Sequence, residues 1–138
     1  MHDKTLLMAL YKRLNDGAID LEKFYQLVVR AAVEVLAGSR ASIWFFDGTL
    51  QDTLVCQTMY ERSNGSWSAG LTMTEDDCGP YFQALMAEKC VSASDGHLQP
   101  STACLDRLEF TPAVSYALHD LLIEVDGAAA GMLRCERD

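Results

Sequence analysis

The chain carries five cysteines, and their spacing limits the thiol chemistry that it could support. They stand at positions 56, 78, 90, 104 and 135, an odd number without a Cys-x-x-C pair, so the pattern predicts neither a disulfide framework nor a zinc site. We expect free thiols in a reducing compartment. Cys56, Cys90 and Cys135 fall in strand-like runs, where cysteine behaves as a small buried apolar residue. Cys78 and Cys104 lie beside predicted helix starts and are the two candidates for a reactive thiol.

Carboxylates and histidine also gather in two polar stretches. Glu75, Asp76 and Asp77 could bind a cation. Carboxylates at the start of a helix more often cap it, because they meet its unpaired N–H groups and its dipole. Asp95 and His97 share a loop, in which an Asp–Gly turn explains the aspartate and the histidine could contact a ligand or a metal.

Other candidate ligand contacts come from aromatic residues and from a strand. Aromatic side chains can line a mostly apolar pocket, and Trp67 and Tyr81 flank loops rather than stand in mid-strand. His119 lies in a predicted strand, where it would be a core or edge residue or, in a sharper hypothesis, a haem ligand. The predicted ligand-binding residues are therefore Trp67, Tyr81, Asp95, His97 and His119. We predict no catalytic residue and no metal ligand.

Length and charge restrict the possible partners. A chain of 138 residues fits one domain, and its net charge of -9 argues against binding nucleic acid or an anionic membrane surface. No apolar run approaches the roughly 20 residues needed to span a bilayer. The first residues lack the features of a secretory signal, so we expect a cytoplasmic domain.

Two amphipathic helices are predicted to come first. Leucines at helical spacing indicate a helix over residues 4–14. Asp20 is placed to cap a second helix, whose apolar stripe runs over residues 21–36 and which Gly38 should end. The two helices could form a layer against a sheet or a dimer surface.

The rest of the chain reads mainly as short strands. A dense apolar run, residues 41–46, predicts a central strand, and a hairpin signal at Asp126-Gly127 joins the last two strands. Short helices should follow Pro80 and Pro100. The other predicted strands are 53–60, 67–73, 90–93, 115–125 and 128–135. This order predicts an α+β fold with a central antiparallel sheet of about five to six strands and helices on both faces.

Several of these signatures, in this order, resemble those of GAF domains. The resemblance covers about residues 20–136. It is carried by the 41–47 strand ending in Asp, Gly70-Leu71 before the acidic stretch, the 79–85 segment Gly-Pro-Tyr-Phe-Gln-Ala-Leu, the 91–95 segment Val-Ser-Ala-Ser-Asp with Pro100 following, and the 126–133 segment. The Pro-Tyr-Phe-x-Ala-Leu part is most similar to GAF modules of bacterial histidine kinases and diguanylate cyclases.

Two departures from the family pattern stand out. Family members often have Asp-Pro where this chain has Gln99-Pro100, which alters the capping of that loop. They often have Pro-Ile where this chain has Leu122-Ile123, which returns a backbone N–H to the strand ladder.

The resemblance implies a sensory or regulatory domain of a bacterial signalling protein over residues 19–138, preceded by an N-terminal helix or connector over 1–18. Such a domain is not itself an enzyme and needs no cofactor. It would bind a small molecule or a partner and relay a conformational change to an output domain, such as the kinase of a two-component system or a cyclase. It would form a homodimer through its N-terminal helices, and the chain would be one domain excised from a longer protein.

The family also offers two alternatives that depend on cysteine or histidine. Photoreceptor GAF domains attach a bilin to cysteine, and Asp76-Asp77-Cys78 is similar to the second-cysteine motif of some of them, although Phe does not follow Cys78 and no His adjoins Cys104. A bilin- or haem-binding photosensor or a redox GAF is the first alternative. The second is a small thiol-dependent enzyme of the GAF-type methionine sulfoxide reductase kind, whose cysteine environment is not matched here. The Asn-Lys-x-x-x-Phe signature of cyclic-nucleotide sites is absent.

Overall fold

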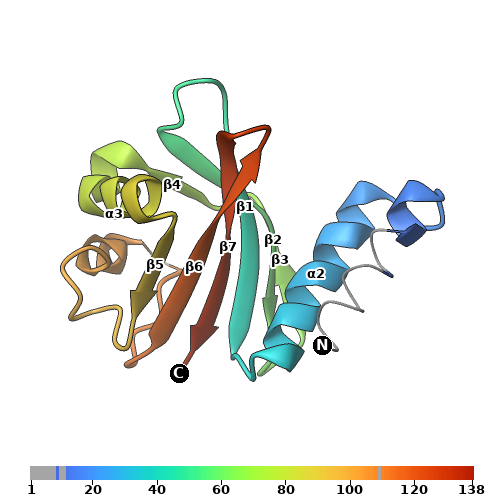
Figure 1. Ribbon diagram of the computed structural model, residues 1–138. Helices are drawn as coiled ribbons and strands as arrows, with labels where there is room; N and C mark the ends of the chain where they lie inside the picture. Colours follow the sequence, from blue (N-terminus) through green and yellow to red (C-terminus); the bar gives the residue numbers. More distant parts are fainter. Residues whose placement is uncertain (1–8, 10–11, 109) are drawn as a thin grey trace.

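In the described part of the chain, seven strands form one antiparallel sheet, and helices cover both of its faces (Figure 1). The structure, a computed structural model, describes residues 9, 12–108 and 110–138. The strands are β1 (Arg40–Phe46), β2 (Thr53–Glu61), β3 (Ser66–Ser68), β4 (Thr72–Thr74), β5 (Cys90–Ala93), β6 (Ala117–Val125) and β7 (Ala128–Arg137). They run in the order β3-β2-β1-β7-β6-β5, and β4 pairs with the first residues of β2. The predicted α+β class is confirmed.

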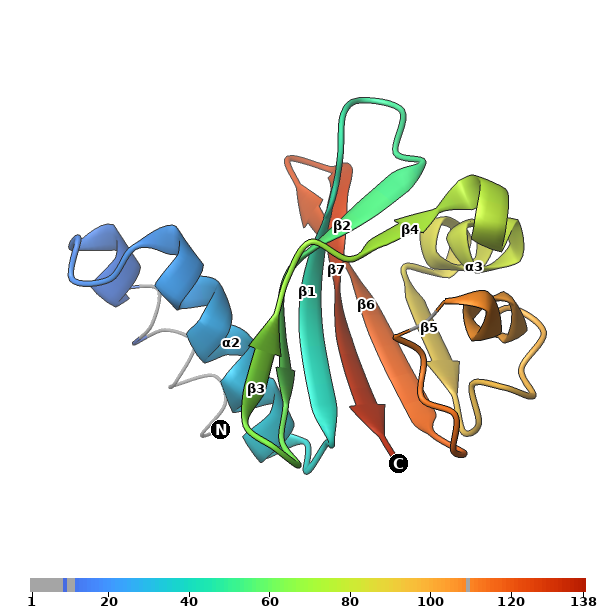
Figure 2. The same cartoon turned by 180° about the vertical axis from the view of Figure 1, so that it is seen from behind.

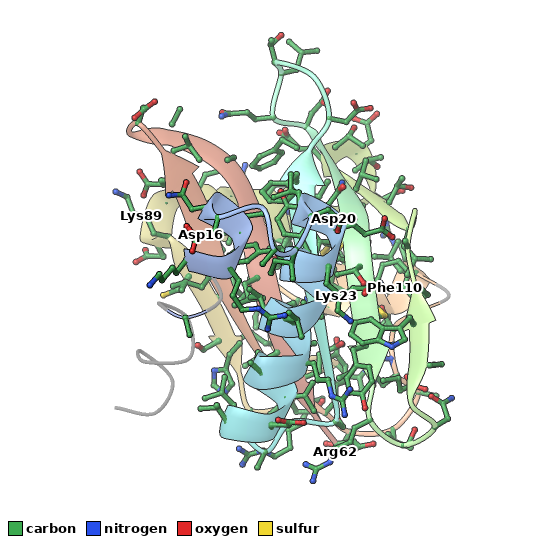
Figure 3. All side chains as sticks on the ribbon, turned by 90° about the vertical axis from the view of Figure 1, so that its right-hand side faces the viewer. Asp16, Asp20, Lys23, Arg62, Lys89 and Phe110 are labelled. Carbon is green, nitrogen blue, oxygen red and sulfur yellow. A yellow bond between two sulfur atoms is a disulfide. The ribbon has the colours of Figure 1, made fainter. Side chains whose placement is uncertain are left out.

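Helix α2 (Leu21–Val35) covers β1 and β2 on one face of the sheet. It begins as predicted at Asp20, whose carboxylate accepts a 2.8 Å hydrogen bond from the backbone N–H of Lys23; both residues are labelled in Figure 3. Its buried residues, Val29 and Val33, stand four apart and therefore share one side of the helix. The helix predicted over residues 4–14 lies largely outside the described residues.

The predicted strand 67–73 is divided into two short strands, β3 and β4. The division falls at Gly70, which has a positive φ of 84° that few other residues adopt. Its N–H donates to the carbonyl of Cys56 (2.8 Å) and the N–H of Cys56 donates to the carbonyl of Leu71 (2.8 Å), so the chain stays attached to β2 while it turns.

Helix α3 (Glu75–Glu88) covers the other face and starts five residues before Pro80. The Asp77 N–H donates to the side-chain oxygen of its cap, Thr74 (3.3 Å), and the three carboxylates that we expected to cap a helix form its first turn. The helix is broken at Cys78 (φ -143°) because Pro80 has no N–H to continue the pattern.

The last part of the chain forms a long covering segment and a hairpin. The segment from residue 94 to residue 116, described except for residue 109, is called the β5–β6 segment below and contains the 3₁₀ helix η1 (Ala103–Arg107). The β6–β7 hairpin turns at Asp126 and Gly127, both with positive φ (52° and 80°) as the predicted turn requires.

The two faces of the sheet carry separate apolar cores, and Figure 2 shows the layers from behind. The core under α2 is small. The core under α3 and η1 is larger and contains Trp44, Tyr81, Leu105, Tyr116 and Leu118. None of the helices in the described part of the chain is long and apolar enough to cross a bilayer. Below, the two sides are called the α2 face and the α3 face.

Candidate functional site

The α3 face contains a buried ion pair. Asp120 and Arg134 stand opposite each other on β6 and β7, and each is 2 % exposed. The guanidinium donates from Nε to Oδ1 (3.0 Å) and from Nη2 to Oδ2 (2.9 Å) of the carboxylate. The hydroxyl of Tyr81, on α3, also donates to Oδ2. We call these three residues the Arg134 cluster, and it joins the sheet to the helix that covers it.

Aromatic rings enclose the guanidinium of Arg134. Its central carbon lies 5.5 Å from the ring centroid of Tyr81 and 5.9 Å from that of Trp44, within the range of cation–π attraction. Trp44 donates from Nε1 to the hydroxyl of Ser42 (2.8 Å) and packs against Phe110 of the β5–β6 segment, with ring centroids 5.5 Å apart. The centre of this face is therefore filled by the chain's own side chains.

Burial and charge shift the pKa values of the Arg134 cluster. Burial raises the pKa of the Asp120 carboxyl, while Arg134 opposes that rise. Burial, together with the Asp120 charge, raises the pKa of Tyr81 well above its ordinary value. Burial disfavours the Arg134 cation, but Asp120 and Tyr81 outweigh it and raise the pKa of Arg134 well above its ordinary value. Tyr81 therefore stays a neutral donor and Arg134 a cation.

Asp95 and His97 tie the β5–β6 segment to itself. The His97 ring contacts the Asp106 carboxylate through Nδ1 (2.5 Å) and the Val114 carbonyl through Nε2 (2.8 Å). Both partners are acceptors, so the two contacts together require a doubly protonated ring. Asp95 accepts from the backbone N–H of His97 and from the hydroxyl of Ser115, both at 3.0 Å. Within the structure, these two candidate ligand contacts hold the ends of a loop together.

Tyr116, the last residue of the same segment, lies beneath the start of that segment. Its hydroxyl is the one buried side-chain polar atom in the described residues that has no hydrogen-bond partner. Burial raises its pKa to about 12, so it is a neutral phenol. Gly96 packs on the ring so closely that an added Cβ would lie 2.3 Å from it. The loop backbone therefore rests directly on Tyr116.

Cys78 and Cys104 form a disulfide, which contradicts the prediction of five free thiols. Their Cα atoms lie 5.3 Å apart and the sulfur atoms are bonded. The pair is separated by 26 residues and joins the break in α3 to η1, a proximity that only the folded chain creates. While they are bonded, neither can attach a bilin. Cys56, Cys90 and Cys135 are free, and Cys90 is exposed rather than buried as we expected.

Trp67 and His119 lie on the other side of the sheet. Trp67, on β3, stands opposite Tyr60 with ring centroids 4.6 Å apart, and Tyr60 belongs to the α2-face core. His119 stands opposite Cys135, also of that core, and contacts the hydroxyl of Ser92 through Nδ1 (3.1 Å). Of the five predicted ligand contacts, the structure thus brings Tyr81, Asp95 and His97 to the α3 face and separates Trp67 and His119 from them.

Three residues of this face were missed by the sequence reasoning: Asp120, Arg134 and Tyr116. One signal existed, because Asp120 falls between Leu118 and Leu122 on the inward-facing side of β6. A charged residue in such an inward row requires a buried partner. In the described part of the chain, no group of three metal-binding side chains is found.

A hollow of about 750 Å³ lies at the end of the sheet where α2 ends and β7 finishes. Arg62, labelled in Figure 3, lies at this end. The most buried charged side chains that line the hollow are already paired, since Arg40 donates to both carboxylate oxygens of Glu136 (2.6 and 2.8 Å). Arg137 donates to the Leu36 carbonyl (2.8 Å). The hollow therefore has few buried charged groups that are free to bind a ligand, and we place the candidate site on the α3 face.

Comparison with known proteins gives structural matches but no sequence matches. No family model and no curated protein matches the sequence. Among solved structures, a GAF domain of nlh2 from A. aeolicus in an inactive state is 13 % identical, covers 99 % of this chain and 79 % of its own, and has a TM-score of 0.69. The phycocyanobilin-bound GAF domain of a cyanobacterial phytochrome is 15 % identical, with 99 % and 80 % covered and a TM-score of 0.73.

A third match is an enzyme. Free methionine-R-sulfoxide reductase from Neisseria meningitidis, solved with its substrate, is 17 % identical, covers 98 % of this chain and 72 % of its own, and has a TM-score of 0.63. At these identities the likeness concerns the fold rather than the activity. It bears out the architecture that the sequence motifs predicted: this chain has the fold of GAF domains.

Proposed function

We propose that this chain is a sensory or regulatory domain of a bacterial signalling protein, without enzymatic activity of its own. It binds a small molecule or a partner surface at the α3 face and relays the change to an output domain. The observation that carries the proposal is that the centre of this face is closed, because the Arg134 cluster is fully buried and covered by the β5–β6 segment. Solved relatives in fold include a segment of a methyl-accepting chemotaxis protein, which supports a signalling role.

A closed face couples binding to movement. A ligand that reaches Arg134 must displace Phe110 and Leu105, which pack into the core beside it. Binding therefore selects a conformation in which the β5–β6 segment has moved. A preformed open cavity would impose no such change.

Hydrogen bonds offer a path from this face to α2. Arg134 lies on β7, and two residues further along that strand the Glu136 carbonyl accepts from the N–H of Ser39 (2.8 Å). Arg137 reaches the Leu36 carbonyl just beyond the end of α2 (2.8 Å). A shift of β7 would thus pull on α2. Leu21 and Leu36, each about half exposed, support the proposed pairing of α2 and the preceding helix with a second copy.

Native mass spectrometry of the protein purified from its own host tests the proposal. We expect a stoichiometric small-molecule adduct, and we expect Tyr81→Phe, which removes one hydrogen bond of the Arg134 cluster, to lose much of it. Tyr60→Phe makes the same change on the α2 face and should retain the adduct. A wild-type protein that carries no adduct, and whose melting temperature does not respond to small molecules extracted from the host, would contradict ligand sensing.

The disulfide favours a second candidate, a thiol-dependent sulfoxide reductase. In such a reaction two thiols supply two electrons and two hydrogens: the sulfoxide becomes a thioether, its oxygen leaves as water, and the thiols become a disulfide. The bonded Cys78–Cys104 pair is the product state that this reaction requires. The fold is shared with the methionine sulfoxide reductase described above.

Turnover separates this enzyme from a sensor. The protein is reduced, freed of reductant and mixed with methionine sulfoxide, and both methionine and the re-formed disulfide are measured. An enzyme would yield one methionine for each disulfide formed, and Cys104→Ser would yield none. Absence of methionine above a protein-free blank would exclude the enzyme and leave the sensory proposal intact.

A further inference from the structure

The β5–β6 segment is hydrogen-bonded mainly to itself. Leaving aside the pairing of strands β5 and β6 that flank it, every hydrogen bond found for its described residues has both partners inside residues 94–116. Thr102, for example, donates from its hydroxyl to the Gly96 carbonyl (2.7 Å), and Thr111 donates to the Leu105 carbonyl (2.5 Å). The segment is therefore a unit with its own internal structure.

Two kinds of contact attach this unit to the rest of the domain. One is apolar packing of Leu105, Phe110 and Tyr116 into the α3-face core. The other is the covalent bond from Cys104, on η1, to Cys78 at the break in α3. Because the described hydrogen bonds do not cross to α3, the disulfide is the specific link between the cover and the helix beside it.

We propose that Cys78–Cys104 is a thiol–disulfide exchange site on which a dithiol reductant acts, and that it serves as a gate, because its reduction frees the β5–β6 segment and opens the way to the Arg134 cluster. This inference rests on the proposed function, because it names the condition under which a ligand can enter. In the cytoplasm, where the sequence leads us to expect this domain, a disulfide is commonly transient and either catalytic or redox-sensing.

The exchange step is defined by the exposure of the two sulfurs. Cys78 is 1 % exposed, whereas Cys104 is partly exposed, so the thiolate of the reductant attacks Sγ of Cys104. The S–S bond breaks, and Cys78 leaves with the electron pair and takes up a proton. The second thiol of the reductant then attacks the mixed disulfide and releases Cys104 as a thiol. Two electrons pass to the protein, and the reductant leaves as a disulfide.

Cys78, the leaving group, stands at the break in α3. It precedes Gly79 and Pro80, where the second part of α3 begins, and its φ of -143° is not helical. The start of a helix favours a thiolate, whereas burial in the apolar core disfavours it, so the exposure of Cys104 decides which sulfur is attacked.

The remaining cysteines are poor candidates for the same chemistry. Burial raises the pKa of Cys56 to about 12 and that of Cys135 to about 11, so both stay protonated near neutral pH and react slowly. Cys90 is exposed and free, and the buried residues of its strand, β5, are Val91 and Ala93 instead. It is therefore a matched control.

Tryptophan fluorescence can report the opening. The chain has two tryptophans, so Trp67→Phe leaves Trp44, which is fully buried and packed on Phe110 of the segment. We expect dithiothreitol to raise the acrylamide quenching constant of Trp44 several-fold, while intact mass confirms the gain of two hydrogens and far-ultraviolet circular dichroism stays unchanged. Cys78→Ser should show the high value without reductant, and Cys90→Ser should match the parent.

Each other outcome has a definite meaning. If the disulfide is fully reduced and Trp44 remains as protected as before, the gate is refuted. If reduction unfolds the whole domain, the disulfide is structural and the gate is likewise refuted. The Cys104→Ala variant, which lacks the disulfide without any reductant, then checks independently whether the domain folds without this bond. A host ligand that binds oxidised and reduced protein equally would overturn the gate but not the sensory function. If the segment opens on reduction but no ligand is ever found, the proposal of the gate stands and the proposed sensory function is overturned.

Discussion

The two faces of the sheet are built from the same strands but by different physics. On the α2 face, Val29 and Val33 pack on Ala41 and Ile43, a helix-on-sheet contact of small apolar side chains. On the α3 face, a carboxylate, a guanidinium and a phenol are buried together under a broken helix and an irregular segment.

The difference separates what holds the domain together from what could respond to a signal. The stabilisation from an apolar contact is proportional to the apolar area that it buries, and it does not depend on pairing with one specific group. A buried ion pair is weak evidence for stability but is strongly sensitive to the loss of one partner. We therefore expect substitutions on the α3 face to change access to its core as well as the stability of the domain, and those on the α2 face to change stability alone.

The largest effect should come from breaking the buried ion pair. Asp120→Asn leaves the Arg134 cation buried without its counter-charge, and we expect a loss of about 3 to 5 kcal/mol in the free energy of unfolding, measured in urea. Asp47→Asn, at an exposed position, is the matched control and should change stability by less than about 0.5 kcal/mol. Equal effects of the two variants would show that the cluster has no special role.

The disulfide should rank second. Cys104→Ser opens a loop closed across 26 residues and is expected to cost about 3 kcal/mol, measured by unfolding without reductant. Under dithiothreitol the difference from wild type should largely vanish. Cys90→Ser should be indistinguishable from wild type in both conditions. A difference that persists in reductant would mean that Cys104 acts through packing rather than through its bond.

An apolar deletion on the α2 face should be smaller and confined to stability. Val33→Ala removes two buried methyl groups, and we expect a loss of about 2 kcal/mol. Val35→Ala makes the same change at a half-exposed position of the same helix and should cost much less. Neither should alter the quenching of Trp44. A rise in that quenching for Val33→Ala would show that a change on the α2 face reaches the core of the α3 face.

The smallest effect concerns pH. Hydrogen bonding to Asp106 and then to the Val114 carbonyl raises the pKa of His97 above 6.5, so the folded domain favours the protonated ring. Its contribution is fully present below the unfolded pKa and is lost as pH rises through the higher, folded pKa. Amide hydrogen exchange in the β5–β6 segment, corrected for the intrinsic rate, should speed up over that window. His97→Gln should abolish the pH dependence and His119→Gln should not; the reverse result would contradict the assignment.

Much of the fold could be predicted because its signals are local. The cap at Asp20, the turn at Asp126-Gly127 and the apolar run 41–46 each depend on a few neighbouring residues, and each forms as expected. The division of β3 from β4 was missed, because a single glycine, Gly70, ends one strand and begins the approach to the next.

The candidate site could not be predicted as well, because it depends on register and on distant contacts. A bulge between Ile123 and Glu124 shifts the pairing of β6 with β7 by one residue, so that Asp120 meets Arg134. A regular hairpin from the same turn would place Asp120 opposite Leu133 and on the wrong face for an ion pair. No local sequence signal predicts the bulge, and none predicts that Cys104 lies next to Cys78 in the folded chain.

The loop that the disulfide closes contains the whole of β5, the strand at one edge of the sheet. An edge strand offers unpaired N–H and C=O groups to other chains, and this one is only four residues long, which limits how much it can recruit. The cross-link ties α3, on one side of β5 in the chain, to η1 on the other, so the segments at both ends of the strand are joined to each other. We therefore expect the oxidised domain to be less prone to edge-to-edge aggregation than the reduced one.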